Sequence, residues 1–512
     1  MPRFPCGALV AAALAAVSAG LVSGCAEPRA PEPSAPGSVF LLGFDGLDPG
    51  LVARFEDEGL LPSFARLRRE GAVGGIRSTI PIVSPPAWTS VATGTPPSDH
   101  GIWSFWLPRG DDERGTFVDA TLRLAPAIWQ DLTAAGRTVG VVNVPVSCPP
   151  DSVNGFMISG FPYPEGAALT WPPELEGEVT RDGYLRDAFG GPPEPDREEE
   201  WLDSMLESAA ARRRIGLDLL FERRPDFSFI VFTTPDRIQH HLWKFHDPEH
   251  PHYRADASDR LKNAVRDIYV WCDDVLAEVM RRLPEGATLL VLSDHGFGPA
   301  YRGISKERLL ADLAETGAGR ATSRNLFGGD FYLENHDDES RARFAAALSA
   351  ATDESGVPLA RAVHDTRSST TRGWGGDLGP DVVAEEMEGR LFVPGRAGGP
   401  LVEPLAPTAF SGYHRREGYF AARGRAIVPG PVRDCDLNDV PAIAMHVLGE
   451  AIPRRYVHNV PRRIFPVDYF VRRPMVFAGA PRDGLRKPEA PDGAPRRDAA
   501  IEDQLRALGY VR

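Results

Sequence analysis

The sequence predicts an α/β fold with a mostly parallel central sheet flanked by helices. Short apolar runs alternate along the chain with longer amphipathic segments, which is the pattern of parallel strands joined by crossover helices. The chain has 512 residues, 42% of them apolar, so it can bury a sizeable core in one large domain or in two or three smaller ones. We find no recurring period of about 20–50 residues and expect no repeat architecture.

The runs give the expected elements in chain order. Strands are predicted at 39–44, 138–144, 227–232 and 288–293, and helices at 50–70, 86–93, 197–222, 257–282 and 339–351. The Gly-rich stretch 301–408 is expected to be an inserted cap region within a main domain that spans 38–475. The pattern weakens after Tyr419, and residues 476–512 are expected to form a tail with a short helix at 501–512.

The charge balance argues against nucleic acid as the main partner. The chain carries 57 Lys and Arg against 71 Asp and Glu, a net charge of −14, whereas phosphate backbones attract basic surfaces. A small anionic substrate held by metal ions stays compatible with this charge. Cys148, Cys272 and Cys435 cannot all pair with one another and lack the spacing of a zinc knuckle, so we assign them no chemistry.

The N-terminus has the pattern of an export signal. Arg3 precedes an Ala-rich apolar stretch that ends in "LVSGC", with Cys25 last, and this stretch resembles a bacterial lipoprotein signal. The resemblance implies that residues 1–24 are removed and that Cys25 is acylated. Residues 25–37 would then form a Pro-rich tether. An ordinary signal peptide or an uncleaved anchor is the alternative.

The lipoprotein interpretation places the protein in the cell envelope, tethered by lipid and facing the periplasm or the exterior. Ala26 after the cysteine suggests sorting to the outer membrane if the host has one, by the rule known for such lipoproteins.

Three predicted strands are followed by acidic residues. Asp45 follows the first, Asp236 the third, and Asp294 the fourth, with His295 beside it. In open α/β sheets ligands collect at the carboxyl ends of the strands, and carboxylates gathered there repel one another unless a cation holds them. An Asp after a strand is usually a turn former, but three in one chain favour a metal site.

The stretch "PDRIQHHLW" places two histidines after Asp236. On a helix, His240 at i+4 lies about 40° around from Asp236 and shares its face, whereas His241 lies about 140° away. Asp236 and His240 can therefore hold one ion together. We expect His246, His250 and His252 to form a surface cluster.

Ser84 has two possible roles. In "IPIVSPPAWTSVATG" it precedes two prolines and a short helical segment, which suits an N-cap. Its hydroxyl would also lie among free amide groups that attract phosphate, and a nearby metal would make it a nucleophile.

Five motifs occur along the chain in this order: "FDGLDPG", "SPPAWTSVATGTPPSDHGI", "PDRIQHHLW", "SDHGFG" and "SGYHRREGYF". Together they resemble the alkaline phosphatase superfamily, and within it the type I phosphodiesterase/nucleotide pyrophosphatase group. The resemblance covers about residues 39–419 and implies an alkaline-phosphatase-like fold.

The resemblance also implies the site. One metal would be held by Asp236, His240 and His414, and a second by Asp45, Asp294 and His295, with Ser84 between them as nucleophile. Imidazole and carboxylate ligands without thiolate suit Zn²⁺, with Mn²⁺ as the alternative. The reaction would then run by double displacement through a phosphoserine.

The sequence departs from the family at two places. Nucleotide pyrophosphatases usually carry an Asn shortly after "HGI", where this chain has Trp103, Ser104 and Phe105, so nucleotide specificity is in doubt. Sulfatases need an Arg where this chain has Trp88, so the sequence argues against a sulfatase. Trp88, Trp103, Phe105 and Trp243 are candidates for an apolar substrate pocket, with core packing as the alternative.

The leading interpretation is a two-metal phosphodiesterase that acts on a small-molecule, lipid or glycan phosphate ester. The alternatives are a phosphomonoesterase or phosphotransferase on the same metals, and a metal-stabilised surface protein that binds its ligand without turnover.

Replacing Cys25 by serine should abolish acylation and release or misprocess the protein, because the lipid is attached to that sulfur. The measurement is membrane fractionation together with the mass of the mature chain. Unchanged fractionation and mass in Cys25→Ser would contradict the lipoprotein interpretation.

Overall fold

The computed structural model describes residues 37–109, 112–186, 192–367, 376–407, 410–456, 460–480, 483–486 and 498–507. The expected signal peptide, Cys25 and the tether up to residue 36 lie outside the described residues, as do 508–512 of the expected last helix. In the part of the chain that is described, no helix is long and apolar enough to cross a membrane.

Among the described residues, nine strands form one central sheet. They are β1 (Val39–Phe44), β2 (Ala72–Arg77), β5 (Val139–Val142), β6 (Gly155–Ile158), β7 (Thr170–Trp171), β8 (Phe227–Phe232), β9 (Thr288–Leu292), β18 (Glu417–Arg423) and β19 (Gly430–Val432). Their order is β19-β2-β18-β9-β1-β8-β5-β6-β7, and the five from β9 to β6 run parallel. The predicted mostly parallel α/β architecture is confirmed.

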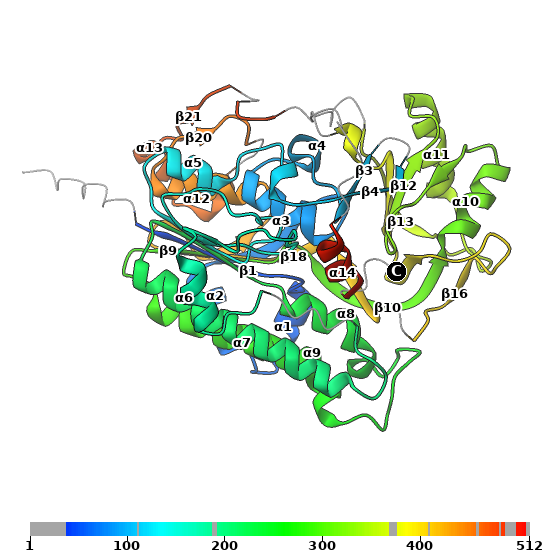
Figure 1. Cartoon of the computed structure of the whole chain (residues 1–512), viewed down its shortest axis with the longest axis horizontal. Helices are drawn as coiled ribbons and strands as arrows, with labels where there is room; N and C mark the ends of the chain where they lie inside the picture. The colour runs from blue at the N-terminus through cyan, green and yellow to red at the C-terminus, as the bar shows by residue number, and fades with distance from the viewer. Residues whose placement is uncertain are drawn as a thin grey trace, which may run out of the picture. The chain divides into compact units, whose positions relative to one another are not determined.

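Helices cover both faces of the sheet (Figure 1). Phe40, Leu42 and Phe44 of β1 pack into one core and Val39 and Leu41 into the other, because side chains alternate along a strand. The first core includes α1 (Pro49–Asp57), α2 (Pro62–Glu70), α7 (Glu198–Arg223), α8 (Thr234–His246), α9 (Asp259–Arg282) and α14 (Ala499–Ala507). The second includes α3 (Ser84–Thr93), α5 (Ile128–Ala134) and α12 (Asp439–Leu448).

Two of the differences between predicted and observed elements follow from local backbone geometry. The single helix expected at 50–70 is two helices, α1 and α2, because Gly59 has a φ of +77° and Pro62 starts a new helix. The strand expected at 138–144 ends at Val142, since Asn143 has a φ of +56°.

The chain after Tyr419 contributes more to the core than its weak pattern suggests. β18 lies between β9 and β2 in the central sheet, and all ten residues of α12 are buried. The helix expected at the C-terminus begins at Ala499.

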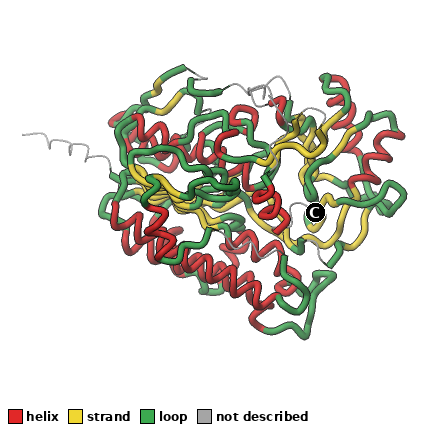
Figure 2. The backbone as a smooth tube through the Cα atoms, viewed as in Figure 1, coloured by secondary structure: helices red, strands yellow, loops and turns green. Residues whose placement is uncertain are grey.

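The stretch expected to be an insertion builds two smaller sheets with α10 (Lys306–Glu315) and α11 (Asp338–Ala350) (Figure 2). One sheet has the order β11-β12-β14-β13 and comprises β11 (Ala321–Thr322), β12 (Gly329–Leu333), β13 (Ala360–Asp365) and β14 (Val382–Glu386). The other contains β10 (Gly296–Ser305), β15 (Gly389–Val393), β16 (Val402–Pro404) and β17 (Gly412–Arg415). The chain thus leaves the central sheet along β10 and returns along β17, which pairs antiparallel with it.

Candidate active site

The carboxyl ends of β9, β1 and β8 lie at one edge of the central sheet. The register pairs Phe44 with Phe232 and Gly43 with Leu292, so the residues that follow these strands lie together. Asp45 directly follows β1, and its backbone N–H donates to the Phe232 carbonyl at 2.9 Å.

His414 reaches this edge by a different route. It lies on β17, and its register partner on β10 is Phe297, two residues after His295. The antiparallel pairing of the two strands therefore brings the end of the insertion back to the ligands that precede it.

The structure brings the six expected ligands together in two buried groups. In each group, one nitrogen or oxygen atom from every residue lies within 4.8 Å of the others. The groups are Asp236, His240, His414 and Asp45, Asp294, His295.

The imidazole rings are oriented by backbone carbonyls. The Nδ1 atoms of His240, His414 and His295 lie 2.9, 2.8 and 3.1 Å from the carbonyl oxygens of Gly412, Ile82 and Gly296. We assign the proton of each ring to Nδ1, because a carbonyl can only accept. Each Nε2 atom then carries no proton, and its lone pair points into the site. This is the usual arrangement of a metal-ligating histidine.

Two of these lone pairs face each other. The Nε2 atoms of His240 and His414 are 2.9 Å apart, and both lie 3.2 Å from Oδ1 of Asp236. With the protons on Nδ1, the two nitrogens and the oxygen are all acceptors, and their approach is favourable only around a cation.

The second group has the same deficit of positive charge. Burial raises the pKa of Asp45, and the Asp236 carboxylate raises it further. Burial and the Asp45 carboxylate likewise raise the pKa of Asp294. Oδ2 of Asp294 and Nε2 of His295 are buried without a hydrogen-bond partner. The residues of both groups therefore fit divalent cations, which supply the missing charge and fill these coordination positions.

Ser84 lies beside the second group. It is the first residue of α3, and its hydroxyl donates to Oδ1 of Asp45 at 3.3 Å. Oδ1 of Asp45 is also 3.4 Å from Nε2 of His295. The N-cap residue is Val83, and no side chain caps this helix. The capping role considered for Ser84 is therefore wrong.

The expected cluster of free amides around Ser84 is also absent from this described helix start. Pro85 and Pro86 have no N–H, and the N–H of Ala87 donates to the Val83 carbonyl at 3.2 Å. Only the N–H of Ser84 itself stays available, so the helix start contributes little to binding a phosphoryl group.

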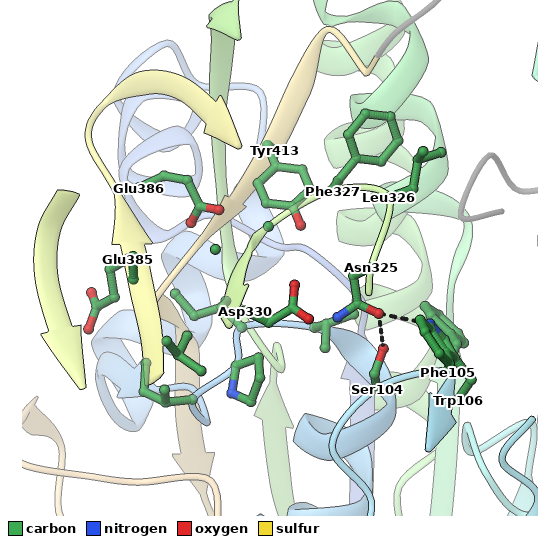
Figure 3. A pocket seen from close by; sticks show the side chains of 18 residues that line it. Ser104, Phe105, Trp106, Asn325, Leu326, Phe327, Asp330, Glu385, Glu386 and Tyr413 are labelled. Atoms are coloured by element: carbon green, nitrogen blue, oxygen red, sulfur yellow. Dashed lines mark hydrogen bonds between the residues drawn. The ribbon is translucent and has the colours of Figure 1, made fainter. Parts of the chain in front are cut away.

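The four aromatic candidates have different surroundings. Trp88 is fully buried, and its Nε1–H donates to Oδ2 of Asp45 at 2.9 Å. Trp103 is buried in a small apolar cluster, and Trp243 stacks on Phe297 with ring centroids 6.0 Å apart. Of the four, Phe105 lines the cavity shown in Figure 3.

His246, His250 and His252 do not form the expected surface cluster, because His250 is buried and the other two are half-buried. His250 is buried, and its Nε2 lies 3.0 Å from the Ala300 carbonyl. His252 contacts the Leu405 carbonyl. The two rings thus link the segment after α8 to the stretch 300–405. Hydrophobic periodicity in the sequence does not predict such contacts. His241 belongs to neither group of ligands and packs edge-on against Trp201.

Several positioning residues escaped the sequence analysis. The side chain of Gln239 donates to the Gly46 carbonyl at 2.7 Å, and Oγ of Ser293 accepts from the Leu47 N–H at 2.7 Å. Gly46 has a φ of +74°, which favours glycine in the turn after Asp45. Trp88 was a candidate for the substrate pocket, but its indole N–H holds the Asp45 carboxylate by a hydrogen bond. Their proximity to the ligands could have marked them, but only tertiary structure shows their contacts.

A model of the type I phosphodiesterase/nucleotide pyrophosphatase family matches residues 39–400. The chain belongs to this family. It is accordingly a metal-dependent hydrolase of phosphoric esters, and the two groups of buried ligands are its candidate metal sites.

Solved structures of phosphonoacetate hydrolase show the same fold. Phosphonoacetate hydrolase from Sinorhizobium meliloti 1021, in complex with phosphonoformate, is 21% identical with a TM-score of 0.54, and the match covers 81% of this chain and 97% of that one. Its complex with phosphonoacetate gives 21% identity, a TM-score of 0.53 and the same coverage. Human ectonucleotide pyrophosphatase/phosphodiesterase 5 is 15% identical over 81% of this chain and 95% of that one, with a TM-score of 0.48.

His240→Ala should lose one metal per chain and most of the activity, because it removes a ligand whose lone pair points at Asp236 and His414. His241→Ala is the matched control and should retain both metals, since its ring packs against Trp201 instead. The measurement is elemental analysis of both purified variants. Equal metal loss in the two would contradict the assignment of ligands.

Proposed function

We propose that this family member hydrolyses phosphodiesters with Ser84 as its nucleophile. The observation that carries the proposal is the hydrogen bond from the Ser84 hydroxyl to Asp45, one of the candidate metal ligands. A hydroxyl held at that position would be adjacent to the ion that the ligand accepts. Ser84 is 7% exposed, so it is shielded from bulk water but borders the site.

Bound cations would polarise the phosphoryl oxygens and lower the pKa of the serine hydroxyl. Asp45 accepts the hydrogen bond of that hydroxyl and so orients its oxygen, while Trp88 fixes the other oxygen of the same carboxylate. The serine oxygen then bonds to phosphorus as the ester P–O bond breaks, and the leaving alcohol takes up a proton. Water then attacks the phosphorus of the resulting serine phosphodiester, which still carries the second alcohol. The bond to the serine oxygen breaks, a phosphomonoester is released, and a proton from the water returns to Ser84.

We further propose that the two ions are zinc, with manganese as the alternative. The six ligands are three imidazoles and three carboxylates, without the thiolates that structural zinc sites use and with more nitrogen than a magnesium site prefers.

The proposed location is the cell envelope, with a lipid anchor on Cys25. The sequence "LVSGC" supports this proposal, and a tether of about a dozen Pro-rich residues would separate the anchor from β1.

Ser84→Ala should lower kcat on a chromogenic phosphodiester by at least about 10³-fold, roughly 4 kcal/mol of transition-state stabilisation. Alanine removes the group that takes the phosphoryl in the first step. Metal content should stay near two ions per chain, because the six ligands are unchanged. The melting temperature should move little, since this hydroxyl does not cap the helix.

Ser84→Thr is the matched control and should keep part of the activity, because it restores a hydroxyl at the same carbon. Measuring kcat, metal content and melting temperature on the same preparations separates chemistry from folding. An alanine variant with more than a tenth of the parent rate would show that Ser84 is not the nucleophile.

A further inference from the structure

A cavity lies between the nucleophile segment and the insertion. It is partly open to solvent and is lined by the four residues 80–83 that precede Ser84. Tyr413, the neighbour of the ligand His414, lines it as well, together with residues 104–106 and residues of β12 and β14. A group esterified to the reacting phosphorus is therefore within reach of this cavity.

Two carboxylates in the cavity have acceptor atoms without partners. Asp330 is only 2% exposed; its Oδ1 accepts from Ser323 at 3.3 Å, but its Oδ2 has no hydrogen-bond partner. Oε1 of Glu386 is buried without a partner as well. Figure 3 shows both carboxylates and the Tyr413 hydroxyl pointing into the same space. Buried acceptors of this kind are costly unless a donor reaches them.

Among the described residues no cation is hydrogen-bonded to these two carboxyl groups, although the positive charge of the buried Lys306 lies near enough to lower the pKa of both. The residues that line the cavity include no Lys, Arg or His. Lys306 is buried nearby, but its Nζ donates to the carbonyls of Asn325 and Leu326. The third acid of the cavity, Glu385, is by contrast paired with His364 and Arg416. Burial raises the pKa of Glu386 to about 8, and the charge of Lys306 only partly offsets this effect.

The rest of the wall is mostly apolar and includes four aromatic side chains. Phe105, Trp106, Phe327 and Tyr413 line it. Aromatic faces attract cations, and carboxylates repel anions, so both features select a guest that is positively charged and donates hydrogen bonds. A divalent metal fits less well, because it would require more oxygen ligands than two carboxylates and a phenol provide.

We propose that this cavity binds an amino group carried by one of the two alcohol groups of the phosphodiester substrate. Asp330 and Glu386 accept hydrogen bonds from the ammonium, and the aromatic side chains surround the carbon chain that bears it. The proposal rests on the proposed function, because it assigns the substrate class of the same site.

The test compares three diesters of equal length: methyl 3-aminopropyl, methyl 3-hydroxypropyl and methyl butyl phosphate. The metal-loaded parent protein should hydrolyse the aminopropyl ester with a kcat/KM at least about 10-fold above either neutral ester, as expected of one charge-assisted hydrogen bond. Product NMR identifies the released alcohol whichever P–O bond breaks. Equal kcat/KM for all three esters would overturn the proposal.

Asp330→Asn should remove most of this preference by lowering kcat/KM for the aminopropyl ester far more than for the butyl ester. Glu386→Gln is a second variant with the same expected direction, in case the first does not fold. Glu388→Gln is the matched control. It removes an exposed carboxylate that pairs with Arg415 and does not line the cavity, so it should keep the preference.

Loss of the preference in Glu388→Gln as large as in Asp330→Asn would show a long-range charge effect and overturn the cavity site. Failure of the parent to hydrolyse any of the three esters would refute the proposed function, and this proposal with it. Hydrolysis without preference refutes the amine site alone.

Discussion

Six buried Asp and His side chains converge at the carboxyl ends of the central strands. The rest of the site depends on the cations that would compensate for their negative charge and lone pairs. The 2.9 Å approach of the His240 and His414 Nε2 atoms is favourable only if a cation lies between their lone pairs. The backbone carbonyls that hold the Nδ1 protons commit each ring to this orientation before any ion binds. Metal binding should accordingly stabilise the folded protein, because the unfolded chain does not gather these ligands.

The topology of the insertion follows from the same requirement. The central sheet delivers Asp45, Asp236, Asp294 and His295 from three adjacent parallel strands, but the Asp236 group needs a second imidazole. β10 and β17 provide it by leaving and re-entering the sheet edge as an antiparallel pair. One consequence is that the insertion is anchored at the candidate metal ligands, and β17 contributes both His414 to the site and Tyr413 to the cavity.

The sequence was informative where one local pattern determines the structure. Strands β1 and β8 and the face shared by Asp236 and His240 follow from periodicity, and the family resemblance identified His414 among the twelve histidines of the chain. Local patterns failed where distant contacts decide. Ser84 has the neighbours of an N-cap, yet its hydroxyl turns to Asp45. Trp88 resembles a pocket residue, yet its indole orients a ligand from within the core.

The two prolines after Ser84 have a further physical consequence. A helix start with free amides stabilises a bound anion through backbone N–H groups, but Pro85 and Pro86 remove two of those donors. Charge that develops on the phosphoryl oxygens must then be stabilised almost entirely by the cations held by Asp and His ligands. The described helix start offers the phosphoryl group few hydrogen-bond donors, so further binding energy must come from contacts with the organic part of the substrate. The unpartnered atoms Oδ2 of Asp330 and Oε1 of Glu386 lie where such a contribution is needed, in a cavity lined by the segment that precedes the proposed nucleophile.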